Sequence, residues 1–132
     1  MKFNKNVSSS RRKSRKAHFN ASDAKRQAIM SSTLSKELKE QYHFKASPIE
    51  VDDEVLVITG GLKGKTAKVT KVDRSKYRVY LDISYREKRN GEVANYGVHS
   101  SNLQITKFAL DKARSAKLEE RKARALRREK SE

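Results

Sequence analysis

The sequence predicts a mostly β fold: a small barrel of five short strands, with a basic extension before it and a basic helix after it. Three observations support this. All five glycines and the only proline fall within residues 48–106. Short apolar runs alternate there with turn residues, and that region holds no helical stretch long enough to cover a sheet. Closing into a barrel leaves no exposed edge, so it is favoured over the alternative, an open sheet.

We therefore divide the chain into three segments: residues 1–47, 48–106 and 107–132. In the first, residues 8–16 are polar and like-charged, and we expect them to stay extended without a partner. Ser22 is predicted to cap a short helix that reaches Met30. A second short helix is predicted over residues 35–42.

Five strands are expected in the middle segment. The first two, residues 55–58 and 67–72, flank a glycine-rich turn. Every second residue from Tyr77 to Tyr85 is apolar, which predicts one long half-buried strand. Asn90 and Gly91 indicate a tight type I′ hairpin. Residues 93–98 and 103–105 complete the set.

One helix is predicted for the last segment. Asp111 is a suitable N-cap for a helix that runs into Arg128, and Glu120 with Arg124 forms a favourable i,i+4 pair. The apolar stripe of this helix is thin. We therefore expect the helix to gain its order by lying on a negatively charged surface.

Charge points to a polyanionic partner. The chain has 32 Lys and Arg against 16 Asp and Glu, a net charge of +16. The excess is +9 in residues 1–47 (12 − 3), +2 in 48–106 (10 − 8) and +5 in 107–132 (10 − 5). A nucleic acid is the favoured partner. A membrane surface is disfavoured because the longest aliphatic run has four residues. With no cysteine, the composition fits a cytosolic or nuclear protein.

Enzymatic chemistry is not predicted. Gly64-Lys65-Thr66 resembles the end of a nucleotide-binding loop, but the preceding glycine has the wrong spacing and a strand pattern follows. The three histidines have no metal-ligand spacing, and His99-Ser100-Ser101 lacks the surroundings of a nucleophile. We expect Asp52-Asp53-Glu54 to be a solvated turn. We therefore predict no enzyme activity, cofactor, metal, small-molecule substrate or homo-oligomer.

Basic side chains cluster at the predicted hairpin tips, where binding residues usually stand on a rigid sheet. Lys63 and Lys65 flank Gly64, and Arg86, Lys88 and Arg89 precede the second turn. An extended basic tail suits structured RNA, whose surface is bound through shape and backbone contacts, although composition alone leaves DNA open.

The segment from Asp52 to Val57, followed by Gly60, Lys63, Gly64 and Lys65, resembles a KOW motif. The whole chain resembles the eukaryotic and archaeal type of the KOW-domain protein family of the large ribosomal subunit, numbered twenty-six in eukaryotes and twenty-four in bacteria. The stretches that carry the resemblance are "RRKSRKAHFNAS", "IMSSTLSKEL", "DDEVLVITG", "REKRNGEV", "GVHSSNLQIT" and "LDKARSAKLEERKA".

The resemblance implies a small SH3-like barrel bound to ribosomal RNA near the end of the peptide tunnel, beside neighbouring ribosomal proteins. It also implies a part in early subunit assembly and, in a eukaryote, passage through the nucleolus to the cytoplasm. The residues that we predict to contact RNA are Arg11, Arg12, Lys13, Arg15, Lys16, His18, Asn20, Lys25, Arg26, Lys63, Gly64, Lys65, Arg86, Lys88, Arg89, His99, Ser101, Arg114, Lys117 and Arg121.

Two alternatives stay open at this point. A KOW-type transcription-elongation module would bind a polymerase surface, but the chain has no further repeats and carries two basic tails. A generic basic DNA-binding protein would use residues 11–16 as an import signal, a run that ribosomal proteins assembled in the nucleolus also need.

Overall fold

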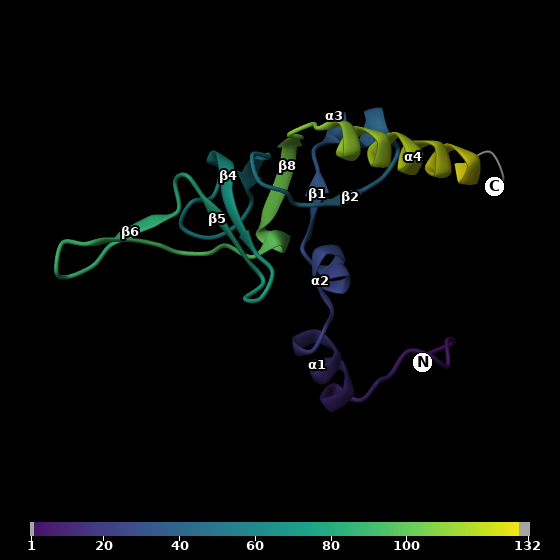
Figure 1. The fold of residues 1–132 in the computed structure, drawn as a ribbon, viewed down its shortest axis with the longest axis horizontal. Helices are drawn as coiled ribbons and strands as arrows, with labels where there is room; N and C mark the ends of the chain where they lie inside the picture. The colour runs from purple at the N-terminus through teal and green to yellow at the C-terminus, as the bar shows by residue number, and fades with distance from the viewer. Residues whose placement is uncertain (1, 130–132) are drawn as a thin grey trace.

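The computed structural model describes residues 2–129, and within them the chain forms four α-helices, eight strands and one 3₁₀ turn (Figure 1). The helices are α1 (Arg11–Phe19), α2 (Asp23–Ile29), α3 (Lys36–Tyr42) and α4 (Lys112–Glu129). The strands are β1 (Ser31–Leu34), β2 (Ala46–Pro48), β3 (Glu54–Val57), β4 (Thr66–Asp73), β5 (Arg78–Leu81), β6 (Tyr85–Glu87), β7 (Val93–Asn95) and β8 (Leu103–Lys107), and η1 (Ser100–Asn102) precedes β8.

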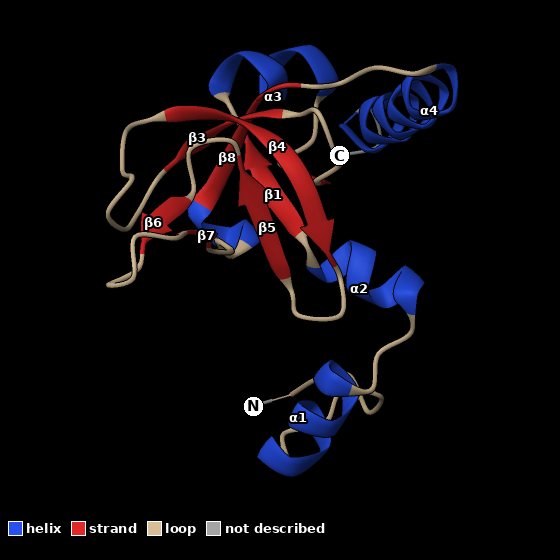
Figure 2. Ribbon diagram, turned by 60° about the vertical axis from the view of Figure 1, so that its left-hand side comes forward, coloured by secondary structure: helices blue, strands red, loops and turns tan. Residues whose placement is uncertain are grey.

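Six strands form one mixed sheet in the order β2-β1-β8-β3-β4-β5 (Figure 2). Strand β1 pairs parallel with β8, and the other neighbours pair antiparallel. Strands β6 and β7 form a separate two-stranded ribbon that projects away from the sheet. Helices α3 and α4 lie together at one end of the sheet, and α1 and α2 extend from the other (Figures 1 and 2).

The predicted closed barrel, and with it the SH3-like barrel implied by the resemblance, is not confirmed. Within residues 2–129, β2 and β5 are the outer strands of the sheet and do not pair with each other. On its other edge, β5 forms only one isolated bridge among the described residues, between Val79 and Val98. A register shift in β4, between Val69 and Lys71, bends the sheet there without closing it.

One reason is that the predicted long strand over residues 77–85 is broken. Tyr77 has a positive φ of 54°, so β5 begins only at Arg78. The chain then turns after Leu81: Ser84 donates its backbone N–H to the Leu81 carbonyl, and its buried hydroxyl bonds both backbone groups of Leu81. The alternation places Tyr77, Val79 and Leu81 correctly in the core. Tyr85, beyond the break, is exposed.

The core lies on the inner face of the six-stranded sheet. Its fully buried members come from strands β3, β4, β5 and β8, which the alternating sequence pattern predicted, and from the chain before β3. They are Met30, Leu34, Val55, Val57, Val69, Val79, Leu103 and Ile105. Because apolar area removed from water stabilises by about 25 cal/mol per Å², these side chains anchor the strands to which the basic elements are attached.

The N-terminal segment is more ordered than the sequence predicted. Residues 11–19 form helix α1 instead of an extended tail. Strands β1 and β2, which the pattern did not indicate, add to the sheet beside β8, and Ser32 donates a hydrogen bond to the Ser100 carbonyl. The predicted helices after Ser22 and Ser35 are confirmed as α2 and α3. The Ser35 hydroxyl accepts a bond from Leu38 N–H, whereas the Ser22 side chain makes no cap bond.

Both hairpin predictions are confirmed, one with a different turn. Thr66 opens β4 instead of a helix, so Gly64-Lys65-Thr66 closes a hairpin and is not a nucleotide loop. In the β6–β7 ribbon, Gly91 N–H donates to the Lys88 carbonyl, and Gly91 has a φ of 83°. Asn90 keeps a negative φ, so the connection is a type I turn followed by a left-handed glycine, not type I′.

Candidate nucleic-acid interface

Helix α1 displays the largest group of basic side chains. Residues 11–16 contribute three arginines and two lysines, all exposed, on a helix whose described residues include no buried side chain. Such a helix cannot be held by its own apolar face. It is instead attached at its C-terminal end, through residues that follow the basic run.

The attachment is a small stack on the turn between β4 and β5. The His18 ring lies 4.2 Å from the buried Tyr77 ring at an interplanar angle of 17°, and the Tyr77 hydroxyl donates to the His18 carbonyl. The Arg26 guanidinium of α2 also lies over the Tyr77 ring, 5.2 Å from its centre. Asn20 ends α1, with its backbone N–H bonded to the Lys16 carbonyl.

Arg26 uses its guanidinium as a clamp on backbone carbonyls. It donates to Phe19 at 2.7 Å, to Ala21 at 2.9 Å, and to Arg74 and Ser75 at 3.2 and 3.0 Å. The planar fork of arginine suits such multiple donation. The clamp ties α1, α2 and the β4–β5 turn together, so Arg26 is a positioning residue and we no longer count it among the proposed RNA contacts. Lys25, next to it, is exposed.

The β3–β4 turn and the 3₁₀ turn before β8 come together. Ile58 N–H donates to the Asn102 carbonyl at 2.8 Å, and a shallow concavity is lined from both sides by Gly60, Leu62 and His99. Lys63, Gly64 and Lys65 are exposed on the first turn. His99 caps η1, its Nδ1 2.8 Å from the Ser101 hydroxyl, as expected for a hydrogen-bonding residue at a strand end.

The β6–β7 ribbon carries Arg86, Lys88 and Arg89, all exposed. Lys88 is paired with Glu92 at 3.2 Å, and both side chains are more than half exposed. Three apolar or aromatic side chains are also exposed on or beside the ribbon: Tyr85, Val93 and Tyr96. Tyr96 lines the concavity at the β3–β4 turn as well as the ribbon, so these two predicted groups form one continuous surface.

Exposed aromatics among cations are the usual platform for unpaired bases. The sequence did not predict either tyrosine as a binding residue. The alternating pattern assigned Tyr85 to a buried strand face, and Tyr96 did not belong to any alternating pattern. Tyr77 was also assigned only to the core, whereas it holds α1 through His18. Proximity to basic residues was the one sequence signal available for Tyr85 and Tyr96.

The C-terminal helix departs from the prediction most clearly at Arg114. Its side chain is only 6% exposed and forms a two-pronged ion pair with Asp53, which is fully buried; one of the two bonds, from Nη2, measures 2.7 Å. Asp53 was expected in a solvated turn. Arg114 thus holds α4 against the sheet, and we remove it from the proposed RNA contacts.

The buried Arg114–Asp53 pair has further hydrogen-bond partners that stabilise its charges. Burial opposes the charge on Arg114, but the hydrogen bonds and charge of Asp53 outweigh it and raise the pKa of Arg114 above its ordinary value. Asp53 also accepts from the backbone N–H groups of Glu50 and Ala109. Buried charges are tolerated in proteins when they are paired and hydrogen-bonded in this way.

The predicted cap and surface pair of α4 are confirmed. Asp111 accepts from Arg114 N–H at 2.6 Å, and Arg124 contacts Glu120 at 2.8 Å. Leu118 is buried, so the thin apolar stripe does pack on the protein. Lys117 is exposed, and Arg121 lies 4.3 Å above the Phe44 ring. Among the described residues, no cluster of metal-ligating side chains and no helix able to cross a membrane occurs.

Comparison with known proteins separates the ribosomal family from the two alternatives, a transcription-elongation module and a generic DNA-binding protein. The sequence profile of a family of ribosomal proteins, L26 in eukaryotes and L24 in archaea, matches residues 8–121. The chain belongs to this family. The match spans α1, the whole sheet and most of α4, so it includes every basic surface described above.

Relatives in this family align over nearly their full length. The chain is 47% identical to large ribosomal subunit protein uL24 of Schizosaccharomyces pombe, over 86% of this chain and 90% of the relative. It is 49% identical to the uL24 protein of Caenorhabditis elegans, over 93% and 86%. The uL24 protein of Candida albicans is 44% identical, over 94% and 98%.

Proposed function

We propose that this protein is a structural component of the large ribosomal subunit, where it binds ribosomal RNA and takes part in translation without catalysis of its own. The near-complete alignment with three proteins named for the large subunit carries this proposal. A ribosomal component of this family is expected in the cytoplasm. The resemblance adds finer expectations: a position near the peptide exit tunnel, a part in subunit assembly and passage through the nucleolus.

The arrangement of charge supports RNA as the partner. Exposed basic side chains lie on α1 and on the continuous surface formed by the β3–β4 turn and the β6–β7 ribbon. Helix α1 is well separated from that ribbon (Figure 1). Separated basic surfaces suit a folded RNA that surrounds the protein, because each can contact a different part of the backbone. Neighbouring ribosomal proteins are the second expected class of partner.

A sucrose gradient of cell extract in high salt tests the proposal. The protein, followed by immunoblot, should sediment with large subunits and polysomes despite the salt, and should move to the top when subunits are unfolded. If it stays at the top throughout, or runs with polymerase or chromatin, the ribosomal assignment fails and one of the two alternatives replaces it.

A further inference from the structure

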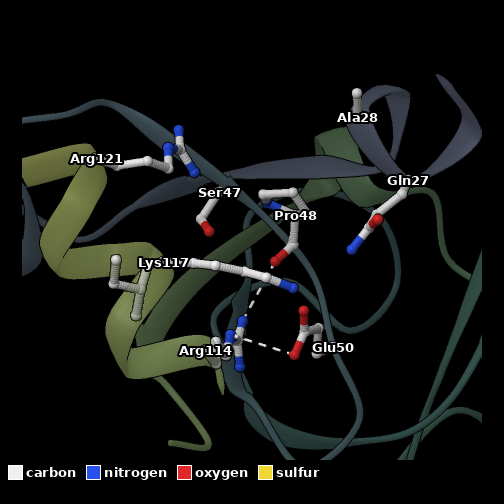
Figure 3. A pocket seen from close by; sticks show the side chains of 9 residues that line it. Gln27, Ala28, Ser47, Pro48, Glu50, Arg114, Lys117 and Arg121 are labelled. Carbon is white, nitrogen blue, oxygen red and sulfur yellow. Dashed lines mark hydrogen bonds and ion pairs between the residues drawn. The ribbon is translucent and has the colours of Figure 1, made fainter. Parts of the chain in front are cut away.

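A concave site of about 330 Å³ lies where α2, β2 and α4 meet (Figure 3). Helix α2 contributes Gln27 and Ala28, and α4 contributes Lys117 and Arg121. Pro48 of β2 and Glu50 complete the part of the lining used below. Ligand sites of proteins are typically ~300–1,000 Å³, so this one has room for a single small group.

The walls of this pocket are already fixed in the free protein. Arg114 donates to the Pro48 carbonyl at 3.3 Å and lies 3.5 Å from Glu50 Oε2, so the buried ion pair also holds the floor of the pocket. On the other side, Arg26 clamps the start of α2 through the Ala21 carbonyl. A pocket between elements that are separately tied down needs no rearrangement to receive a ligand, which favours affinity.

One side of the pocket attracts an anion. Lys117 and Arg121 lie one turn apart on α4. Arg121 donates from Nη2 to the Ala46 carbonyl at 3.0 Å, and neither cation has a carboxylate partner within 4.0 Å among the described residues. Burial, and then repulsion from Arg124, lowers the pKa of Arg121, as expected for a cation without a compensating negative charge.

Two residues with acceptor groups face the Lys117 side chain, which extends across the pocket (Figure 3). Gln27 and Glu50 point toward Lys117 from α2 and from the end of β2 (Figure 3). Glu50 contacts Arg114 through Oε2, so its other oxygen is not engaged by that ion pair. Ala28 and Pro48 supply apolar lining. A ligand that fits all three parts has an anionic group, a flat body and a hydrogen-bond donor at its far edge.

We propose that this pocket binds one unstacked nucleotide of the RNA, with its phosphate on Lys117 and Arg121 and its base between Ala28 and Pro48. Proteins read RNA largely through such splayed-out bases. Glu50 accepts from an exocyclic amine, as acidic side chains do from the amine of cytosine. Adenine, guanine and cytosine carry such an amine, and uracil does not. The inference rests on the proposed function, since it takes RNA as the partner.

The first test titrates the full-length protein with AMP, GMP, CMP, UMP and ribose 5-phosphate, followed by the NMR amide signals of Gln27, Ala28 and Lys117. The three amine-bearing nucleotides should bind about fivefold more tightly than UMP or ribose 5-phosphate, in line with one hydrogen bond. Equal affinity for all five compounds would mean that only the phosphate is bound. That result, or no saturable change, overturns the proposal.

A second test fills the pocket. Ala28→Leu should weaken AMP binding by at least about fivefold, because its branched side chain occupies the space of the base. Ala24→Leu is the matched control, since Ala24 is exposed on the same helix and does not line the pocket. Equal weakening by both variants, or by neither, contradicts the proposal.

Glu50→Gln tests whether Glu50 recognises the base, separately from any role in folding. A glutamine amide donates as well as accepts, so this variant should bring UMP to within about twofold of AMP while the protein still folds. Unchanged selectivity would show that Glu50 does not read the base.

Filter binding of the wild type to extracted large-subunit RNA separates the pocket proposal from the proposed function. If RNA binds but the nucleotide tests fail, only the pocket is wrong; if RNA does not bind, the proposed function fails.

Discussion

The two ends of the molecule are both basic, yet they use their cations in opposite ways. Helix α1 carries five cations in residues 11–16, all facing solvent. The Arg114 side chain of helix α4 instead points into the protein and forms an ion pair with Asp53. The sequence presents these residues alike, as part of a segment excess of +9 at one end and +5 at the other. The role of a cation therefore depends on whether the fold brings a buried carboxylate to it.

The attachments of the two helices differ accordingly. Helix α4 is held by a buried ion pair, by Leu118 and by Arg121 over Phe44. Helix α1 is held at one end by an aromatic stack and by backbone carbonyls that accept from Arg26. We therefore expect disruption of the α4 attachment to affect the whole fold, and disruption of the α1 attachment to release only the arm.

Arg114→Ala should produce the largest effect. It leaves the Asp53 carboxylate buried without its partner, which costs about 3–5 kcal/mol in comparable cases. Since domains are stable by only about 5–15 kcal/mol, the midpoint of urea unfolding should fall markedly. Arg124→Ala is the control: its ion pair with Glu120 is exposed, and we expect a change of about 0.5 kcal/mol or less. Similar losses in both variants would contradict the internal role of Arg114.

Arg26→Gln should release α1 and α2 from the β4–β5 turn. A glutamine cannot reach all the carbonyls that the guanidinium contacts, and hydrogen bonds with a charged partner contribute about 1.5–3 kcal/mol. Amide hydrogen exchange of residues 15–20 should therefore accelerate by one to two orders of magnitude, while β8 stays protected. Lys25→Gln, one residue earlier and exposed, should leave the exchange unchanged. Accelerated exchange in β8 would show that the clamp supports the sheet, not only the arm.

Tyr77→Phe should have a smaller effect in the same place. It keeps the ring that stacks on His18 and removes only the hydroxyl that bonds the His18 carbonyl, a contribution of about 0.5–1.5 kcal/mol. Exchange at residues 15–20 should rise by about tenfold or less. Tyr80→Phe, in strand β5 just after Tyr77, provides the matched removal of a hydroxyl. If the two variants behave alike, the stack does not depend on this bond.

The smallest expected effect is an acid-dependent loosening of the β4–β5 turn. The Ser75 hydroxyl bonds Asp73 and lowers the pKa of that carboxyl below its usual value, with the backbone N–H groups of Ser75 and Lys76 adding to the effect. A depressed pKa in the folded state means that this stabilisation is complete above the unfolded pKa, near 4, and is lost as pH falls through the folded value. An NMR titration should show it, and Ser75→Ala should move the Asp73 pKa upward.

The strands of the sheet were largely predictable because an alternating pattern reports burial directly: Val79 and Leu81 face the core as the period requires. The pattern failed at Ser84, where the bonds between its hydroxyl and the backbone of Leu81 turn the chain. It also failed at β1 and β2, which are too short to show a period. Nothing local reveals that Asp53 and Arg114 meet, since 61 residues separate them. The same holds for Tyr77 and His18, so the fold of α1 was missed.

Salt dependence of RNA binding tests the central contrast most directly. We would measure affinity for large-subunit RNA across salt for two variants, after urea unfolding has shown that each folds cooperatively: Arg11→Gln/Arg12→Gln/Lys13→Gln, and Asp53→Asn/Arg114→Gln. The log–log slope should fall in magnitude by about 2–3 for the first, at roughly 0.7–0.9 for each phosphate that the variant no longer neutralises, and stay unchanged for the second. An unchanged slope for the first variant, or a reduced slope for the second, would contradict the division into outward RNA-binding cations and an internal structural one.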